Sequence, residues 1–174
     1  NALGSNTTGA TNVAVGENAL DADADQSGCV AVGYEAFSSL TSGNHNTAIG
    51  YQAGDHYTST TDTTLVGYSA GTAGTTGECN TVVGSHAFAA ATTAEHSTAI
   101  GHAALNKTTT GSNNIAIGRL ALLENTTGAA NIAIGNEALD AQTTAQNNVA
   151  VGYQAASTLT TTGANVAIGT RALQ

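Results

Sequence analysis

One period of 17 residues runs through this chain without interruption. Gly recurs at positions 16, 33, 50, 67, 84, 101, 118, 135, 152 and 169, each preceded by Val or Ile and followed three residues later by Ala. No residue is inserted or lost between neighbouring units, so ten units account for 170 of the 174 residues. Such a period indicates similar coils stacked on one another rather than a globular domain.

The residues of each unit favour strands over helices. Every unit has a triplet such as Val13-Ala14-Val15 whose last two residues are apolar, and the chain contains no Pro and is rich in Thr, a β-branched residue. A strand that returns after a fixed interval stacks on its copy one turn along, about 4.8 Å away. We therefore expect an all-β, parallel β-solenoid (a β-roll) with ten coils of 17 residues.

Two positions of the unit predict its cross-section. The Gly after each triplet is expected at a corner that needs a positive φ or a close approach of the backbone. The position that is always Ala predicts a thin interior from which bulky side chains are excluded.

Polar residues also recur at fixed positions. Asn precedes the triplet in seven of ten units, and the exceptions are Cys29, Thr63 and Ser97. Thr stands at 7, 41, 58, 75, 92, 109, 126, 143 and 160, each followed by Thr or Ser. Side chains stacked in this way are expected to bridge successive turns by hydrogen bonds.

Alternation along the triplet gives each strand two apolar faces. Ala14 points to one side, and Val13 and Val15 point to the other. If Ala lines the interior, Val and Ile form a stripe along the outside of the rod, which a soluble monomer rarely exposes. We expect the stripe to be buried against copies of the chain in a parallel homotrimer or another rotationally symmetric oligomer.

The units NTAIGYQAG (46–54), NVAVGYQAA (148–156) and NIAIGNEAL (131–139) carry a resemblance to a known family. They resemble the left-handed parallel β-roll repeats in the heads of trimeric autotransporter adhesins, and more closely the Thr-Thr-Gly-containing version in phage tail-fibre-like proteins. The resemblance covers the whole chain, although adhesin heads commonly have a shorter period.

The resemblance implies a left-handed, homotrimeric, fibrous β-roll that acts as a stiff spacer and presents binding surfaces. We expect one repeat domain over residues 1–174, a fragment of a longer extracellular protein of a virion tail fibre or a bacterial surface adhesin. Its expected partners are its own copies and a glycan or protein receptor on a host cell. Phage and bacterial owners both remain open, as does the receptor.

Composition excludes other classes of function. Twelve acidic and only three basic residues give a net charge of −9, which argues against nucleic acid and anionic membrane surfaces as partners. The chain contains no apolar run of about 18 residues, the length that would suggest membrane insertion. The sequence has no GxSxG, Walker-type or HExxH motif, so we expect no enzyme activity and no cofactor.

Tyr34, Tyr51 and Tyr68 are the predicted ligand-binding residues. They occupy the position after Gly on three successive turns, and Tyr153 repeats it later. Rings stacked along a rod offer a platform for sugar rings. The alternative is a self-stacking ladder that covers the corner.

Asp21, Asp23 and Asp25 are weak candidates for a metal site. Alternate carboxylates in DADAD could clamp a hard cation such as Ca²⁺. Gln26 and Val32 stand where an EF-hand loop has Gly and Glu, so a solvated acidic turn is the alternative.

His and Cys residues predict no complete site. His86 and His102 lie on neighbouring turns, but no Cys or carboxylate completes a ligand set around them. Cys29 and Cys79 are nearly three turns apart, about 14 Å at strand spacing, which is too far for a disulfide. We expect both thiols to be buried or half-buried.

The Thr rows allow an alternative function, a monomeric ice-binding solenoid that holds ordered water on hydroxyl and methyl groups. Adjacent Thr residues such as Thr7 and Thr8 point to opposite faces of a strand, which gives two single rows unless the pair sits on a corner.

Overall fold

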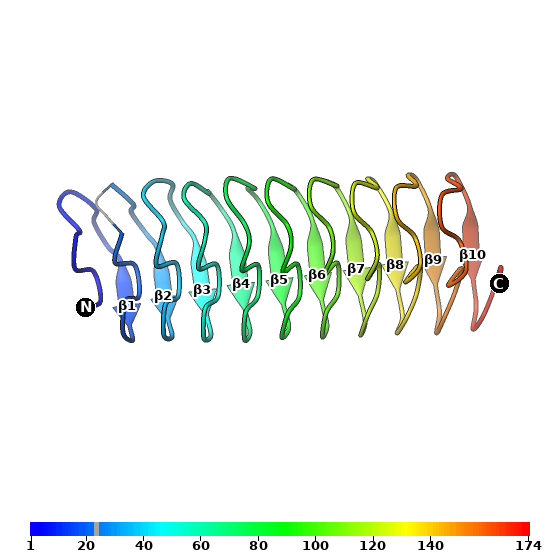
Figure 1. Cartoon of the computed structure of the whole chain (residues 1–174), viewed down its shortest axis with the longest axis horizontal. Coiled ribbons are helices and arrows are strands. Elements are labelled where there is room, and N and C mark those ends of the chain that lie inside the picture. The colour runs from blue at the N-terminus through cyan, green and yellow to red at the C-terminus, as the bar shows by residue number, and fades with distance from the viewer. Residues whose placement is uncertain (23–24) are drawn as a thin grey trace.

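The protein is a straight rod of stacked coils (Figure 1). The computed structural model describes residues 1–22 and 25–174. Each coil contributes one strand of three residues: β1 (Val13–Val15), β2 (Val30–Val32), β3 (Thr47–Ile49), β4 (Thr64–Val66), β5 (Thr81–Val83), β6 (Thr98–Ile100), β7 (Ile115–Ile117), β8 (Ile132–Ile134), β9 (Val149–Val151) and β10 (Val166–Ile168).

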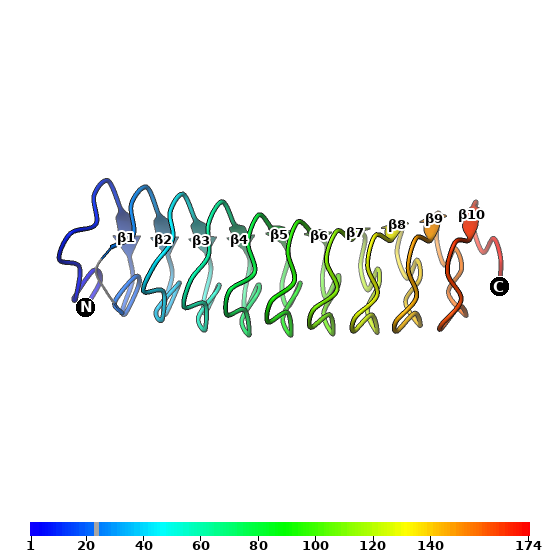
Figure 2. The ribbon, with the colours of Figure 1, turned by 90° about the horizontal axis from the view of Figure 1, so that it is seen from above.

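The ten strands form one parallel sheet in chain order. Every strand pairs with the equivalent residues one coil along, as Ala14 pairs with Ala31. The predicted all-β parallel solenoid with a 17-residue repeat is confirmed, and Figure 2 shows its coils from above. Within the described part of the chain, no helix has the length and apolarity to cross a membrane.

Glycine at the corner is required for two reasons. The ten corner glycines have φ between 123° and 145°, a region that L side chains rarely adopt. A Cβ on Gly33 would also lie 2.2 Å from the carbonyl oxygen of Gly50 on the next coil. The predicted corner is confirmed, and at every corner from Gly16 to Gly152 a Cβ would collide with the backbone of the next coil, whereas Gly169 has open space around it.

The interior is narrow only where the Ala row lines it, and it holds large side chains next to that row. The Ala row is fully buried from Ala19 to Ala155, as predicted, but Phe37, Phe88 and Leu139 are fully buried too. The expectation that bulky residues are excluded is wrong. The residue after each Ala adopts a positive φ, as at Phe37 (49°), and in six coils it is a buried Phe or Leu beside the methyl row: Leu20, Phe37, Phe88, Leu105, Leu122 and Leu139.

Changes of side-chain volume compensate one another around β3 and β4. The position that holds Phe37 in one coil is Gly54 in the next, where a Cβ would lie 2.5 Å from the Phe37 ring. Tyr57 fills space farther along the coil, and a Cβ on Gly74 would lie 2.0 Å from its ring. Leu65 replaces the usual Ala in the centre of β4. Glycines therefore make room for the largest interior side chains.

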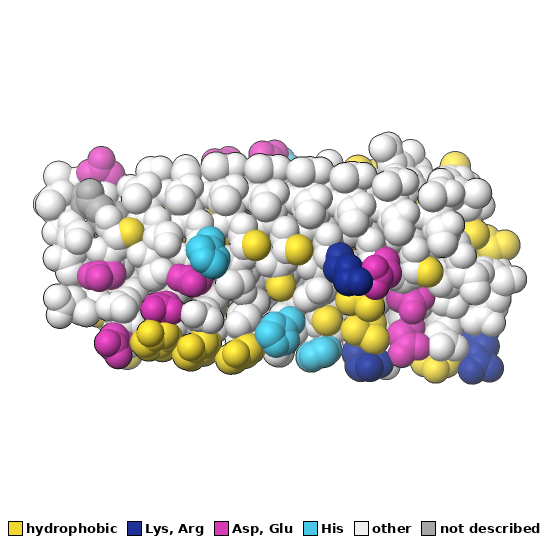
Figure 3. Space-filling view, in the orientation of Figure 1, with side chains coloured by type: hydrophobic (Ala, Val, Ile, Leu, Met, Phe, Trp, Pro, Cys, Tyr) yellow, Lys and Arg dark blue, Asp and Glu magenta, His cyan; other side chains and the backbone are white. Residues whose placement is uncertain are grey.

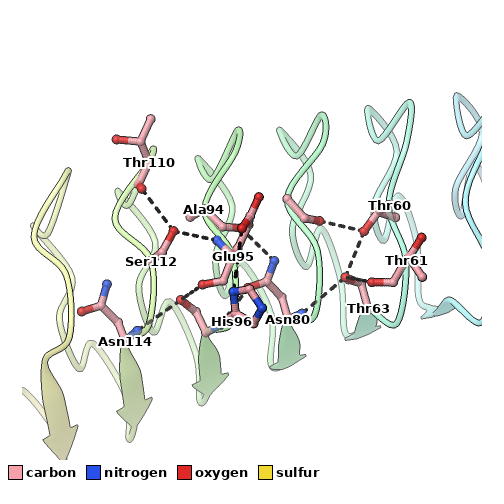
Figure 4. A network of polar contacts seen from close by, with 12 residues as sticks. Thr60, Thr61, Thr63, Asn80, Ala94, Glu95, His96, Thr110, Ser112 and Asn114 are labelled. Carbon is pink, nitrogen blue, oxygen red and sulfur yellow. Dashed lines mark hydrogen bonds and ion pairs between the residues drawn. The ribbon is translucent and has the colours of Figure 1, made fainter.

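The Asn row bridges successive coils from inside, as predicted. Asn80 donates through Nδ2 to the carbonyl oxygen of Ala94 (2.9 Å), and its Oδ1 accepts the N–H of Ser97 (2.9 Å). Where the row changes to Thr63, the hydroxyl accepts the N–H of Asn80 at a longer 3.4 Å (Figure 4). Buried backbone groups thus find partners in side chains.

The first Thr of each pair forms a second ladder. Thr75 donates its hydroxyl to the carbonyl oxygen of Thr92 at 2.9 Å, and the same bond recurs from Thr41 to Thr143. This predicted bridging is also confirmed. The hydroxyls of this row are consequently engaged by the protein itself.

Candidate functional site

The outer side of the sheet is an exposed apolar face. We define the apolar face as the first and third residues of β1 to β10; these are 16 Val or Ile residues and four Thr residues. In the middle of the rod, the third residues Ile117 and Ile134 are 36% and 37% exposed, the first residues of the same strands are half-buried, and the central Ala residues are fully buried. The predicted outer stripe is confirmed.

A row of aromatic rings lies on the turns that follow β2 to β6. We call Tyr34, Tyr51, Tyr68, His86 and His102 the ring edge. Side chains of the apolar and His classes follow one another along the lower border of the rod in Figure 3. The five rings come from five successive coils, and all five residues are exposed.

The three tyrosines stack as predicted. The ring centroids of Tyr34 and Tyr51 are 5.1 Å apart with planes 15° from parallel, and those of Tyr51 and Tyr68 are 5.3 Å apart with planes 10° from parallel. Tyr51 therefore has a neighbouring tyrosine ring against each of its two faces. The broad faces of the tyrosine rings therefore do not form an open platform. The rims of the rings and the phenol hydroxyls remain available to a ligand.

Two histidines extend the row beyond the residues that the sequence singled out. His86 meets Tyr68 edge-on at 5.1 Å between centroids, and His102 meets His86 edge-on at 6.4 Å. His86 stands one position later in its coil than the tyrosines, so the repeat does not predict that its ring joins the row. Its positive φ of 55° is shared by the same position in other coils. In the sequence, these two histidines stand out only as possible metal ligands.

Carboxylates flank the beginning of the ring edge. A hydrogen bond to the Glu35 carboxylate, with the charges of Glu35 and Glu17, raises the pKa of the Tyr34 phenol. Glu35 also accepts a hydrogen bond from Nε2 of Gln52 at 2.8 Å. The ring edge is thus bordered by groups that donate and accept hydrogen bonds.

Tyr153 occupies the same position as the stacked tyrosines but has a different environment. It is 44% exposed, as is Tyr51, and the Arg171 guanidinium lies 5.8 Å from its ring centroid. Residues 136 and 170, at the same position in the adjacent coils, are Asn and Thr. Tyr153 is therefore a natural comparison for the stacked rings.

The acidic turn is tied to the first coil. Oδ1 of Asp21 accepts the N–H of Gly4 at 3.0 Å, and Asp25 accepts the hydroxyl of Thr8. Asp23 lies outside the described residues. Across residues 1–22 and 25–174, no three His, Cys, Asp or Glu side chains surround a common point that could hold a metal ion.

The two cysteines differ in exposure. Cys29 is buried in the Asn row, where burial raises the pKa of its thiol and the Asn46 amide approaches Sγ at 3.9 Å. Cys79 is exposed, so the expectation of a buried or half-buried thiol is wrong for it. It stands one position before the Asn row, where His45 and His96 are exposed too. Both thiols are free, as expected.

Each of the three basic side chains has a partner. Lys107 contacts the Glu124 carboxylate at 2.7 Å, and Arg119 contacts Glu137 at 2.9 Å. Arg171 donates to the side chain of Gln154 at 3.0 Å. No cluster of free cations therefore arises from these residues.

Comparison with family models, with curated proteins and with solved structures gives no match for this chain. Its function is therefore argued from the apolar face and the ring edge alone.

Proposed function

We propose that this chain is a non-enzymatic structural and attachment module of a fibrous extracellular protein, either a virion tail fibre or a bacterial surface adhesin. It acts as a stiff spacer, assembles with copies of itself through the apolar face, and carries a receptor-binding surface for a host glycan or protein. The observation that carries the proposal is the apolar face, which continues over all ten coils.

The regularity of this face favours a second copy of the chain as its partner. Each coil presents two β-branched side chains at the same height, so an identical rod can oppose equivalent rows along its length. Copies related by rotation about an axis parallel to the rod keep every coil beside its equivalent. We assign three copies and a left-handed coil, in agreement with the repeats that the sequence resembles.

Light scattering tests the assembly. We expect about three times the 17.1 kDa chain mass at micromolar concentration. Ile117→Lys, in the middle of the apolar face, should shift the protein toward monomer because a buried, unpaired charge opposes association. Circular dichroism of the same sample checks that the coils are intact.

Thr110→Lys is the matched control. Thr110 is exposed on the ridge formed by the second Thr of each pair, outside the apolar face. It should leave the mass unchanged. A wild-type mass of 17.1 kDa, or equal loss of assembly in both variants, would contradict the proposal.

A monomeric ice-binding solenoid is the second candidate. One observation favours it: the second Thr of each pair is exposed on five successive coils, at Thr76, Thr93, Thr110, Thr127 and Thr144, and these hydroxyls bond to no described residue. The first Thr row donates its hydroxyls to the protein, so the surface available to ice is the single row of these five described residues. Thermal hysteresis in a monomeric sample, lost on Thr110→Lys, would favour this function over the fibre.

A further inference from the structure

We infer that the ring edge binds one extended, uncharged β-1,4-linked polysaccharide that lies parallel to the rod. The inference rests on the proposed attachment function and names the class of receptor. It follows from the spacing of the rings, from the groups that they leave exposed, and from the charges around them.

The spacing requires a linear ligand with a matching repeat. Successive tyrosine rings are 5.1 and 5.3 Å apart, His86 follows Tyr68 at 5.1 Å, and His102 follows His86 at a longer 6.4 Å. An extended peptide advances by only about 3.3 Å per residue, and a polyproline helix by about 3.1 Å. A flat β-1,4-linked glycan advances by nearly one ring spacing per sugar, so each sugar can meet one ring in turn.

The exposed groups select a ligand with many hydroxyls. Stacking covers the faces of Tyr51, so its hydroxyl and the edge of its ring face the solvent. The edge of an aromatic ring is electropositive and favours oxygen acceptors. Beside the row, Nε2 of Gln52 donates to the Glu35 carboxylate at 2.8 Å. The amide of Gln52 has a second N–H and the carboxylate has further lone pairs, which can bond to a ligand. A glycan hydroxyl can pair with each of these groups.

A helical peptide is the competitor with a similar repeat, because an α-helix has a pitch of about 5.4 Å. Helix recognition uses an apolar groove that receives one face of the helix. The ring edge is a single row, and no cavity is found among the described residues. The polar border of the row therefore favours the glycan.

Charge further restricts the class of glycan. Glu17 and Glu35 lie beside Tyr34, and the chain carries a net charge of −9. These negative charges disfavour polyanions such as uronic acid polymers, because the ring edge itself includes no Lys or Arg. An uncharged glycan avoids that repulsion.

Titration calorimetry with cello-oligosaccharides tests the inference on the assembled protein. Cellohexaose should bind more tightly than cellobiose because it spans more rings, and more tightly than maltohexaose, which has the same sugars in a coiled α-1,4 chain. Tyr51→Phe keeps the stacked ring but removes its hydroxyl, and should weaken cellohexaose binding by about two- to tenfold.

Tyr153→Phe is the control, since Tyr153 has the same exposure as Tyr51 but lies outside the stack. Its binding should equal that of the wild type. No binding of cellohexaose, equal affinity for the three sugars, or equal losses in both variants would overturn the inference. The mass measured on the same sample separates the two proposals: an intact trimer without binding refutes only the glycan, and a binding monomer refutes only the fibre.

Discussion

Asn131 allows a direct test of the interior ladder because its polar atoms have defined partners. Its Oδ1 accepts the N–H of Asn148 at 3.0 Å, and its Nδ2 donates to the carbonyl oxygen of Ala145 at 2.9 Å. The side chain is fully buried. Nδ2 also donates to Oδ1 of Asn114 on the preceding coil at 3.2 Å. Asn131→Ala therefore removes three bonds between coils in a region that water does not reach.

The expected loss follows from which groups lose their partners. The carbonyl of Ala145 keeps a donor, because Nε2 of Gln142 lies 3.1 Å away. The N–H of Asn148 is left without an acceptor, and a buried unsatisfied group costs about 1–3 kcal/mol. We expect Asn131→Ala to lower the free energy of unfolding by about 2–3 kcal/mol.

A Ser at the same position should be tolerated better. Ser97 occupies the equivalent place in its own coil, and its hydroxyl accepts the N–H of Asn114 at 3.3 Å. Asn131→Ser then keeps an acceptor for Asn148 and should lose only about 1 kcal/mol. Urea denaturation followed by circular dichroism gives the change in midpoint for each variant.

Asn147→Ala is the control for substitution itself. Asn147 is exposed, and Ala130 and Ala164 occupy its position in neighbouring coils with φ of 56° and 60°. Its loss should stay below about 1 kcal/mol. Equal losses for Ala and Ser at position 131, or a loss no larger than the control, would refute the role given to the ladder.

Further predictions concern the corner, the core and one carboxylate. Gly135→Ala should unfold the protein or cost several kcal/mol, because its Cβ would lie 2.3 Å from the Gly152 oxygen, whereas Gly169→Ala, with open space around it, should cost clearly less in thermal melts. Tyr57→Phe should leave stability unchanged or raise it by up to about 1 kcal/mol, because the Tyr57 hydroxyl is buried with no hydrogen-bond partner among the described residues and burial raises the pKa of this phenol. Burial and the charges of nearby carboxylates raise the pKa of Asp140, so the folded state holds its proton more tightly than the unfolded state does. Stability should therefore fall as pH rises above the ordinary carboxyl pKa, and urea midpoints should show that Asp140→Asn reduces this fall.

The backbone path was predictable from the sequence because the repeat carries it. Gly16 and its equivalents mark the corner, and alternation in Val13-Ala14-Val15 assigns the inner and outer sides of each strand. Stacking in register follows from a period without insertions, since any slip would place Val inside and Ala outside.

The width of the interior could not be predicted in this way. The invariant Ala suggested a uniformly thin roll, but the next residue turns inward with a positive φ and places Phe37 or Leu139 in the core. Alternation along a strand does not predict which way a side chain points when its residue has a positive φ. The exchange among Gly54, Gly74 and Tyr57 involves contacts between different coils, which a single-unit pattern does not contain.

The candidate site was predicted in part for a related reason. The three tyrosines share one position in the unit, so their stacking could be predicted, whereas His86 enters the row from the next position. The orientation of the rings depends on side-chain torsions that the repeat does not specify. The exposure of Cys79 was not predicted either, because this residue has a positive φ of 56° and alternation along a strand does not predict the direction of such a side chain.

The most direct test of the assembly asks whether other copies cover the apolar face. A single thiol is placed either on that face, by Ile134→Cys, or on the exposed Thr ridge, by Thr127→Cys, with Cys29 and Cys79 both changed to Ser. Maleimide labelling rates of the native protein are then compared with those in urea. We expect strong protection of the thiol at position 134 and none at position 127. Equally fast labelling at both positions in the native protein would contradict the proposed assembly.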